Sequence, residues 1–123
     1  MTSTTSLFRG TDGGEAVTAG TQIFKAGDAA EHLFVVQEGR VDIMVGDAVI
    51  EKVGTGGMFG EMAMIDGSTR SADAVAGEDS TILPIDKKRF EFLITETPYF
   101  ARTVLKVLVE RLRSATANSS ACT

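Results

Sequence analysis

Hydrophobic residues in the first two thirds of the chain occur in short runs separated by glycine-containing segments. Val41, Ile43 and Val45 alternate with Asp42 and Met44, which is typical of a strand with one buried face. Similar runs predict seven strands: Glu15–Ala19, Thr21–Lys25, Leu33–Gln37, Val41–Val45, Ala48–Val53, Ala72–Ala76 and Thr81–Ile85. Many short, evenly spaced strands predict an all-β sandwich or barrel for this part of the chain.

The hydrophobic period changes to that of a helix in the last third of the chain. Phe90, Leu93 and Ile94 recur at helical spacing, and Asp86 precedes them as a candidate N-cap. Thr97-Pro98 then interrupts the pattern, and proline is favoured in the first turn of a helix. We therefore expect two C-terminal helices over residues 87–113.

The second of these helices carries a wide apolar surface. One stripe consists of Ala101, Val104, Leu105, Leu108 and Leu112, whereas Val107 and Val109 fall outside it. The surface either packs against the β domain or meets a partner. We expect the helix to end near Arg113, with flexible segments at residues 1–14 and 114–123 flanking one domain over residues 15–113.

Composition limits the functional class. The chain has 123 residues, of which 43% are hydrophobic and 24% charged, so it can bury one core without disulfides or metals. Its net charge of −5 does not favour nucleic acid or anionic membranes as partners. Cys122 is the only cysteine, which excludes an intrachain disulfide. With no apolar signal segment, we expect a cytoplasmic location.

One segment between strands combines residues suited to binding a phosphorylated sugar. Residues 61–65 predict one helical turn, and the free amides at a helix start attract anions. Gly60 permits close approach of the backbone, and Arg70 returns at the next strand with a guanidinium that suits phosphate. Glu61 can accept a hydrogen bond from a neighbouring hydroxyl.

This segment resembles the phosphate-binding cassette of the cyclic nucleotide-binding domain family. The pattern is Phe-Gly-Glu-x-Ala-x-Ile at Phe59–Ile65 followed by Arg-Ser-Ala at Arg70–Ala72. The family's domain occurs in the catabolite activator protein, in regulatory subunits of cAMP-dependent protein kinase and in cyclic nucleotide-gated channels. The resemblance runs from about Glu15 to Arg113 and also includes Gln22–Asp28, Leu33–Val36 and Glu38–Val41.

The resemblance implies an antiparallel β-roll (a jelly-roll-like double-stranded β-helix) that is mainly β, with a short cassette helix and two C-terminal helices. It implies that cAMP or cGMP is the ligand, with no cofactor. Arg70 would bind the equatorial phosphate oxygens and Glu61 the ribose 2′-hydroxyl. The remaining implied contacts are the Gly60 backbone, the Met62 and Ala63 amides, the Ser71 hydroxyl, the Ala72 amide, and Ile43 and Ile50, which are expected on inward strand positions, against the base. A serine at position 71 leaves cAMP and cGMP both open.

The sequence departs from the family pattern at both ends. Glycine-rich Arg9–Gly14 replaces the usual N-terminal helix, and only Ala115 and Thr116 stand where the C-terminal helix commonly caps the base. No helix-turn-helix follows. The chain is therefore expected to signal through a protein partner or self-association, or to be a fragment of a larger regulator.

Two other functional classes compete with a ligand-responsive sensor. A β-roll with a vestigial cassette could serve as a nucleotide-independent interaction or structural protein. An enzyme is disfavoured because the sequence has no nucleophile–base pair and no Walker-type loop. A metal site is not expected either, because His32 is the only histidine and reads as a surface residue at a strand start. Lys87-Lys88-Arg89 reads as a solvated face.

Overall fold

The computed structural model describes residues 13–122, with side chains described as far as Arg113. Residues 1–12, where most of the predicted flexible N-terminal segment falls, lie outside the described residues. The chain forms two compact units that meet between Phe90 and Glu91. No helix among the described residues is long and apolar enough to cross a membrane.

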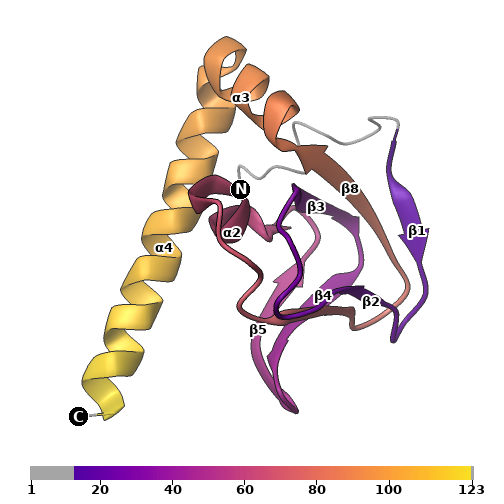
Figure 1. Cartoon of the computed structure of the whole chain (residues 1–123), viewed down its shortest axis with the longest axis vertical. Helices are drawn as coiled ribbons and strands as arrows, with labels where there is room; N and C mark the ends of the chain where they lie inside the picture. Colours follow the sequence, from indigo (N-terminus) through magenta and orange to yellow (C-terminus); the bar gives the residue numbers. More distant parts are fainter. Residues whose placement is uncertain (1–12, 123) are drawn as a thin grey trace. The chain divides into compact units, whose positions relative to one another are not determined.

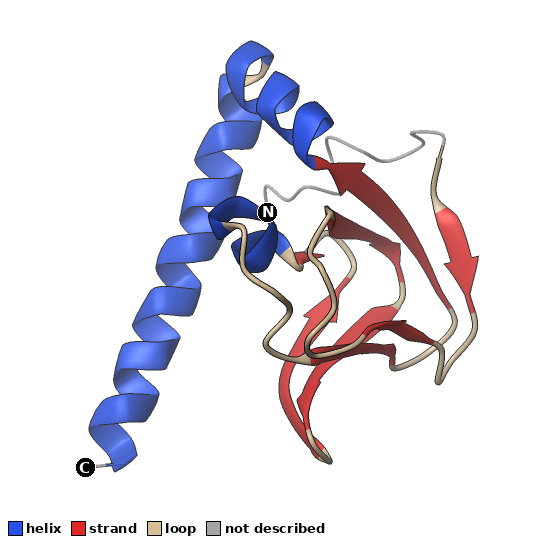
Figure 2. Cartoon of the chain, viewed as in Figure 1, coloured by secondary structure: helices blue, strands red, loops and turns tan. Residues whose placement is uncertain are grey.

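The first unit is built from eight strands in two antiparallel sheets (Figures 1 and 2). The first sheet has the order β1-β8-β3-β6 and the second the order β2-β7-β4-β5. The strands are β1 (Glu15–Val17), β2 (Gln22–Phe24), β3 (His32–Glu38), β4 (Arg40–Val45), β5 (Ala48–Gly54), β6 (Met58–Phe59), β7 (Asp73–Ala76) and β8 (Ser80–Asp86). This architecture confirms the predicted antiparallel β-roll with flanking helices.

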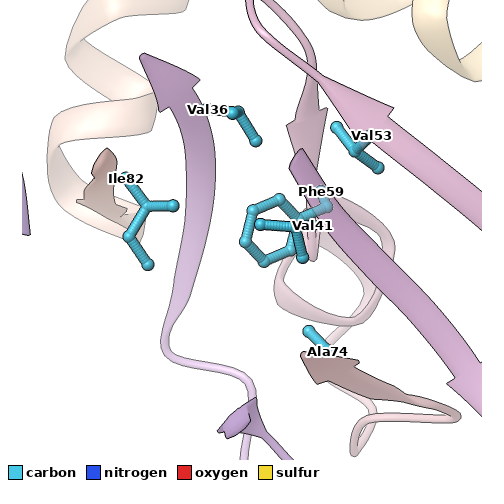
Figure 3. Close-up of a cluster of buried hydrophobic side chains, with 6 residues drawn as sticks. All are labelled: Val36, Val41, Val53, Phe59, Ala74 and Ile82. Carbon is cyan, nitrogen blue, oxygen red and sulfur yellow. The ribbon is translucent and has the colours of Figure 1, made fainter. Parts of the chain in front are cut away.

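The core of the first unit lies between the two sheets (Figure 3). Its central cluster consists of buried side chains that both sheets contribute: Val36, Phe59 and Ile82 from the first, and Val41, Val53 and Ala74 from the second. Because alternate residues of a strand point to one face, the alternating runs in the sequence deliver these side chains inward. Because the two sheets pack on this cluster, the positions of β6 and β7, between which the cassette lies, are fixed.

All seven predicted strands are present, with ends that differ by two residues at most. β1 ends at Val17 rather than Ala19, because a turn begins there in which the Thr21 amide donates to the Thr18 carbonyl at 3.0 Å. β6 was not predicted, since two residues are too short to show an alternation.

The helices begin where the sequence predicts. In α3 (Lys87–Glu96) the Arg89 amide donates to Asp86 Oδ1 at 2.8 Å, which confirms Asp86 as the N-cap. In α4 (Pro98–Cys122) Pro98 is the first residue. The predicted end near Arg113 is wrong, because α4 continues to Cys122. Neither glycine nor proline occurs after Pro98, so nothing in the sequence breaks the helix.

The apolar stripe predicted on α4 is buried in one part and exposed in another. Leu105 and Leu112 are 63% and 69% exposed, whereas Phe100 and Val104 are buried. The helix carries apolar residues on two adjacent rows, and spacing alone does not decide which row is buried.

Candidate functional site

The predicted cassette helix, α2 (Glu61–Asp66), is enclosed by two glycines with positive φ. Gly60 at its start has φ 80° and Gly67 at its end has φ 75°, a conformation that other residues rarely adopt. The Gly67 and Ser68 amides both donate to the Ala63 carbonyl, which closes the helix. No described side chain caps the start of α2.

Arg70 is the buried cation of the site and is only 5% exposed. Its Nη1 donates to the Gly60 carbonyl and its Nη2 to the His32 carbonyl, both at 2.5 Å. Its Nε is buried and has no hydrogen-bond partner among the described residues. The guanidinium thus links the cassette to the start of β3 and retains an unused donor.

The turn before β3 holds the backbone of Arg70 as well. The Arg70 amide donates to the Asp28 carbonyl at 2.9 Å, and the Gly27 amide donates to the Arg70 carbonyl at 2.8 Å. The Asp28 carboxylate in turn accepts from the Lys25 amide at 3.0 Å. These bonds fix the point from which the Arg70 side chain enters the interior.

An aromatic cluster lies against the guanidinium. Arg70 Cζ is 4.0 Å from the centroid of the Phe24 ring and 6.0 Å from that of Phe34. The Phe34 and Phe59 rings stack at 5.1 Å, and Phe24 meets Phe34 and Phe59 at 6.0 and 5.9 Å. Stacking on an aromatic face is a favourable setting for a guanidinium.

Burial and charge act on Arg70 in opposite directions. Burial lowers the pKa of Arg70, because the charged form loses hydration, while the negative charges of Glu61 and Asp28 raise it. Glu61 is itself 1% exposed. The site therefore brings a buried acid and a buried base together beside Gly60, which is the pairing predicted from the sequence.

The other predicted contact residues differ in exposure. Met62 and Ser71 are exposed, Ala63 is half-buried and Ala72 is buried. All four belong to the same cassette as Gly60, Glu61 and Arg70, and their contacts with a nucleotide stay predictions.

The two isoleucines predicted to meet the base lie in different environments. Ile43 is half-buried and packs against the core cluster. Ile50 is 60% exposed rather than inward. Ile43 pairs with Glu51 and Met44 with Val49, so the register shift leaves Ile50 without a cross-strand partner and the two-residue alternation fails there.

Sequence reasoning missed three contributors to the site. Phe24 belongs to a segment that resembles the family, yet an aromatic residue in a strand is ordinarily core. The His32 side chain is exposed at the start of β3, as predicted, but its carbonyl accepts a hydrogen bond from Arg70. Every residue has a backbone carbonyl, so the sequence does not indicate which one binds Arg70. Asp28 could have been suspected from the Gly27-Asp28 turn. Among the described residues, no group of acidic, histidine or cysteine side chains is placed to hold a metal ion.

Known proteins with similar sequences include a channel and a receptor protein that are named for cyclic nucleotides. A cyclic nucleotide-gated potassium channel of Rhizobium etli is 36% identical over 95 residues, which is 77% of this chain and 26% of the channel. The cyclic AMP receptor protein of Thermus thermophilus is 35% identical over 101 residues, or 78% of this chain and 47% of that protein. The chain thus spans between about a quarter and a half of these relatives.

The fold and the family agree with these similarities. The crystal structure of the Thermus thermophilus catabolite activator protein superposes with a TM-score of 0.76 and 30% identity, covering 91% of this chain and 60% of that one. The family model described as "Cyclic nucleotide-binding domain" matches residues 15–97, which include both sheets and the whole cassette. The chain belongs to the cyclic nucleotide-binding domain family.

Proposed function

We propose that this chain binds a cyclic nucleoside monophosphate, cAMP or cGMP, with the cyclic phosphate on Arg70. The observation that carries the proposal is a buried guanidinium whose Nε lacks a hydrogen-bond partner among the described residues. Burying a charge or an unsatisfied polar atom is costly, so an unpartnered buried donor calls for an explanation, and a bound anion supplies one.

The chemistry of Arg70 favours a phosphate over other ligands. Its guanidinium donates to two neutral carbonyls, those of Gly60 and His32. A phosphate would add negatively charged acceptors, which a guanidinium can bind through two parallel hydrogen bonds. Burial also strengthens the attraction, because the effective dielectric there is lower than in water.

The rest of the cassette supplies contacts suited to the sugar and the base. Glu61 lies close enough for its charge to affect Arg70, so one ligand carrying a phosphate and an adjacent 2′-hydroxyl would engage both. We assign the remaining contacts as the sequence predicts: the backbone of Gly60, Met62, Ala63 and Ala72, the Ser71 hydroxyl, and Ile43 and Ile50 for the base.

The chain acts in this proposal as a regulatory module without catalysis. Nucleotide orders the cassette and changes the preferred position of α3 and α4, because a ligand shifts a conformational equilibrium only through its different affinity for the two states. A partner protein or a second copy of the chain then reads that change. The names of the channel and the receptor protein support a regulatory role. The cytoplasmic location stays a prediction.

Thermal unfolding with added nucleotide tests the binding step. A ligand at 100 times its Kd stabilises the folded state by about 2.7 kcal/mol, which corresponds to a rise in Tm of about 10 °C for a domain of this size. We expect this rise with cAMP or cGMP and none with 5′-AMP or 5′-GMP. No rise with either cyclic nucleotide would favour the alternative, a β-roll interaction protein with a vestigial cassette.

Hydrogen exchange tests the signalling step separately. If nucleotide binding is coupled to the helices, amides of α3 and α4 change their exchange rates together with those of α2. Changes in exchange rate confined to α2 and its flanking strands would agree with nucleotide binding but would overturn the proposed coupling to α3 and α4.

A further inference from the structure

Phe24 has a relation to Arg70 that its place in β2 alone does not require. Its ring centroid lies 4.0 Å from Arg70 Cζ, within the range of a close cation–π contact. β2 pairs with β7, the strand that follows Arg70, and Phe24 lies opposite Ala74 in that pairing. The sheet therefore sets the ring beside the guanidinium by backbone register.

We infer that Phe24 is a positioning residue, which holds the Arg70 guanidinium in the orientation that binds the ligand phosphate. This inference rests on the proposed function. The Gly60 and His32 carbonyls hold two nitrogens of the guanidinium at its edge, and the Phe24 ring covers one of its faces. Together they restrict the rotation of a long side chain, so less conformational entropy remains to be lost when the ligand binds.

The ring is itself held in place by other aromatic residues. Phe24 is tilted by 38° against Phe34 and by 40° against Phe59. Phe59 immediately precedes Gly60, and a Cβ on Gly60 would lie 3.2 Å from the Phe24 ring and 2.8 Å from Arg70 Nη1. The ring, the glycine and the guanidinium are therefore packed as one unit, in which a change at Phe24 moves Arg70.

An aliphatic side chain would fill similar space without the same effect. The face of an aromatic ring carries negative potential that attracts a cation, and a flat guanidinium stacks on a flat surface. Leucine offers neither property. A purely structural role for Phe24 instead predicts that leucine lowers stability and leaves nucleotide affinity unchanged.

Calorimetric titration with cAMP and cGMP separates the two roles. The variants are Phe24→Leu, Phe24→Tyr as the conservative rescue, and Leu83→Ala as the control, a buried residue of β8 outside the aromatic cluster. We expect Phe24→Leu to weaken binding by about 2- to 30-fold, the loss of one cation–π contact. Phe24→Tyr should stay close to wild type, and Leu83→Ala should lower Tm and leave affinity close to wild type. Equal losses of affinity in Phe24→Leu and Leu83→Ala would overturn the inference.

A nuclear magnetic resonance measurement tests the inference without any nucleotide. The Arg70 Nε–Hε signal can be assigned by its absence in Arg70→Lys. In the free protein, the ring current of Phe24 should displace this signal in wild type and in Phe24→Tyr, and the displacement should vanish in Phe24→Leu. A signal unaffected by Phe24→Leu would overturn the inference. A wild-type chain that shows the displacement but binds neither nucleotide would instead contradict the proposed function.

Discussion

Two arginines of the β-roll show how a structural cation differs from one set aside for a ligand. Arg40 has its Nε 3.0 Å from Asp42 and a second nitrogen 3.8 Å from Glu78, and it donates to the Gly77 carbonyl at 3.1 Å. Its side chain is 37% exposed. Its charge is therefore met by two carboxylates, the half-buried one of Asp42 and the exposed one of Glu78.

Arg70 has the opposite surroundings. It is buried, it donates to the backbone carbonyls of Gly60 and His32, and its Nε has no partner among the described residues. Both side chains bind a glycine carbonyl, so contact with a turn does not distinguish them. What distinguishes them is that Arg40 forms ion pairs with carboxylates, whereas Arg70 feels the charges of Glu61 and Asp28 and keeps a buried Nε with no hydrogen-bond partner among the described residues. Under the proposed function, the ligand phosphate meets that donor.

The largest expected effect comes from removing each arginine in turn. Arg70→Ala should weaken cyclic nucleotide binding by about 10- to 100-fold or more, since a hydrogen-bonded charge contributes about 1.5–3 kcal/mol. Arg40→Ala should lower Tm and leave affinity unchanged. Calorimetry and thermal melting of both variants measure the two effects. Similar losses of affinity in the two variants would remove the distinction.

A pair of glycine substitutions separates backbone strain from displacement of Arg70. Gly60 and Gly67 both have positive φ, so alanine at either position should cost about 1–2 kcal/mol of stability. Only at Gly60 does the new Cβ meet Arg70, at 2.8 Å, whereas at Gly67 it meets open space. We expect both variants to melt earlier and only Gly60→Ala to bind nucleotide more weakly. Unchanged affinity in Gly60→Ala would show that the position of Arg70 does not control binding.

Glu61 and Glu78 form a comparable pair of acids, one beside each arginine. Glu61→Gln keeps an acceptor for the ribose hydroxyl but loses its charge, so affinity should fall by about 3- to 10-fold. Glu78 is an exposed partner of Arg40, and Glu78→Gln should have no effect on affinity. Binding isotherms of both variants measure the two affinities. A loss of affinity in Glu78→Gln but not in Glu61→Gln would contradict the assigned role of Glu61.

The smallest expected effect concerns the turn that closes α2. Hydrogen bonds from Ser68 lower the pKa of Asp66, first from its side chain and then from its backbone amide, which lies 2.8 Å from Asp66 Oδ1. A lowered pKa stabilises the fold above the unfolded value of about 3.9, and this contribution is lost as the pH falls through the folded value. Asp66→Asn should therefore lower Tm slightly at pH 7 and by a smaller amount near pH 3. A constant difference in Tm between these pH values would contradict this assignment.

The sequence predicts the strands and the cassette well because both depend on local patterns. Alternation such as that of Val41 and Ile43 needs only a few residues, and Gly60, Gly67 and Arg70 belong to one short motif whose backbone needs are local. The predicted end of α4 near Arg113 was wrong, because the residues that follow show neither a strong preference for helix nor a residue that breaks one.

The contacts that could not be predicted from the sequence join residues that are far apart along the chain. The position of Phe24 beneath Arg70 depends on the pairing of β2 with β7, and the His32 carbonyl comes from a third strand. Ile50 was placed inward on the assumption of regular alternation, which the register shift in β5 breaks. Pairing and register arise when distant strands meet, so a pattern within one strand does not reveal them.

The central claim is that Arg70 is held for the phosphate of a cyclic nucleotide. Calorimetric titration of wild type, Arg70→Ala and Arg40→Ala with cAMP and with cGMP tests it most directly. The account predicts that at least one of the two nucleotides binds wild type and Arg40→Ala with similar affinity, and binds Arg70→Ala at least about 10-fold more weakly. Equal binding by all three proteins, or no binding of either nucleotide by wild type, would contradict it.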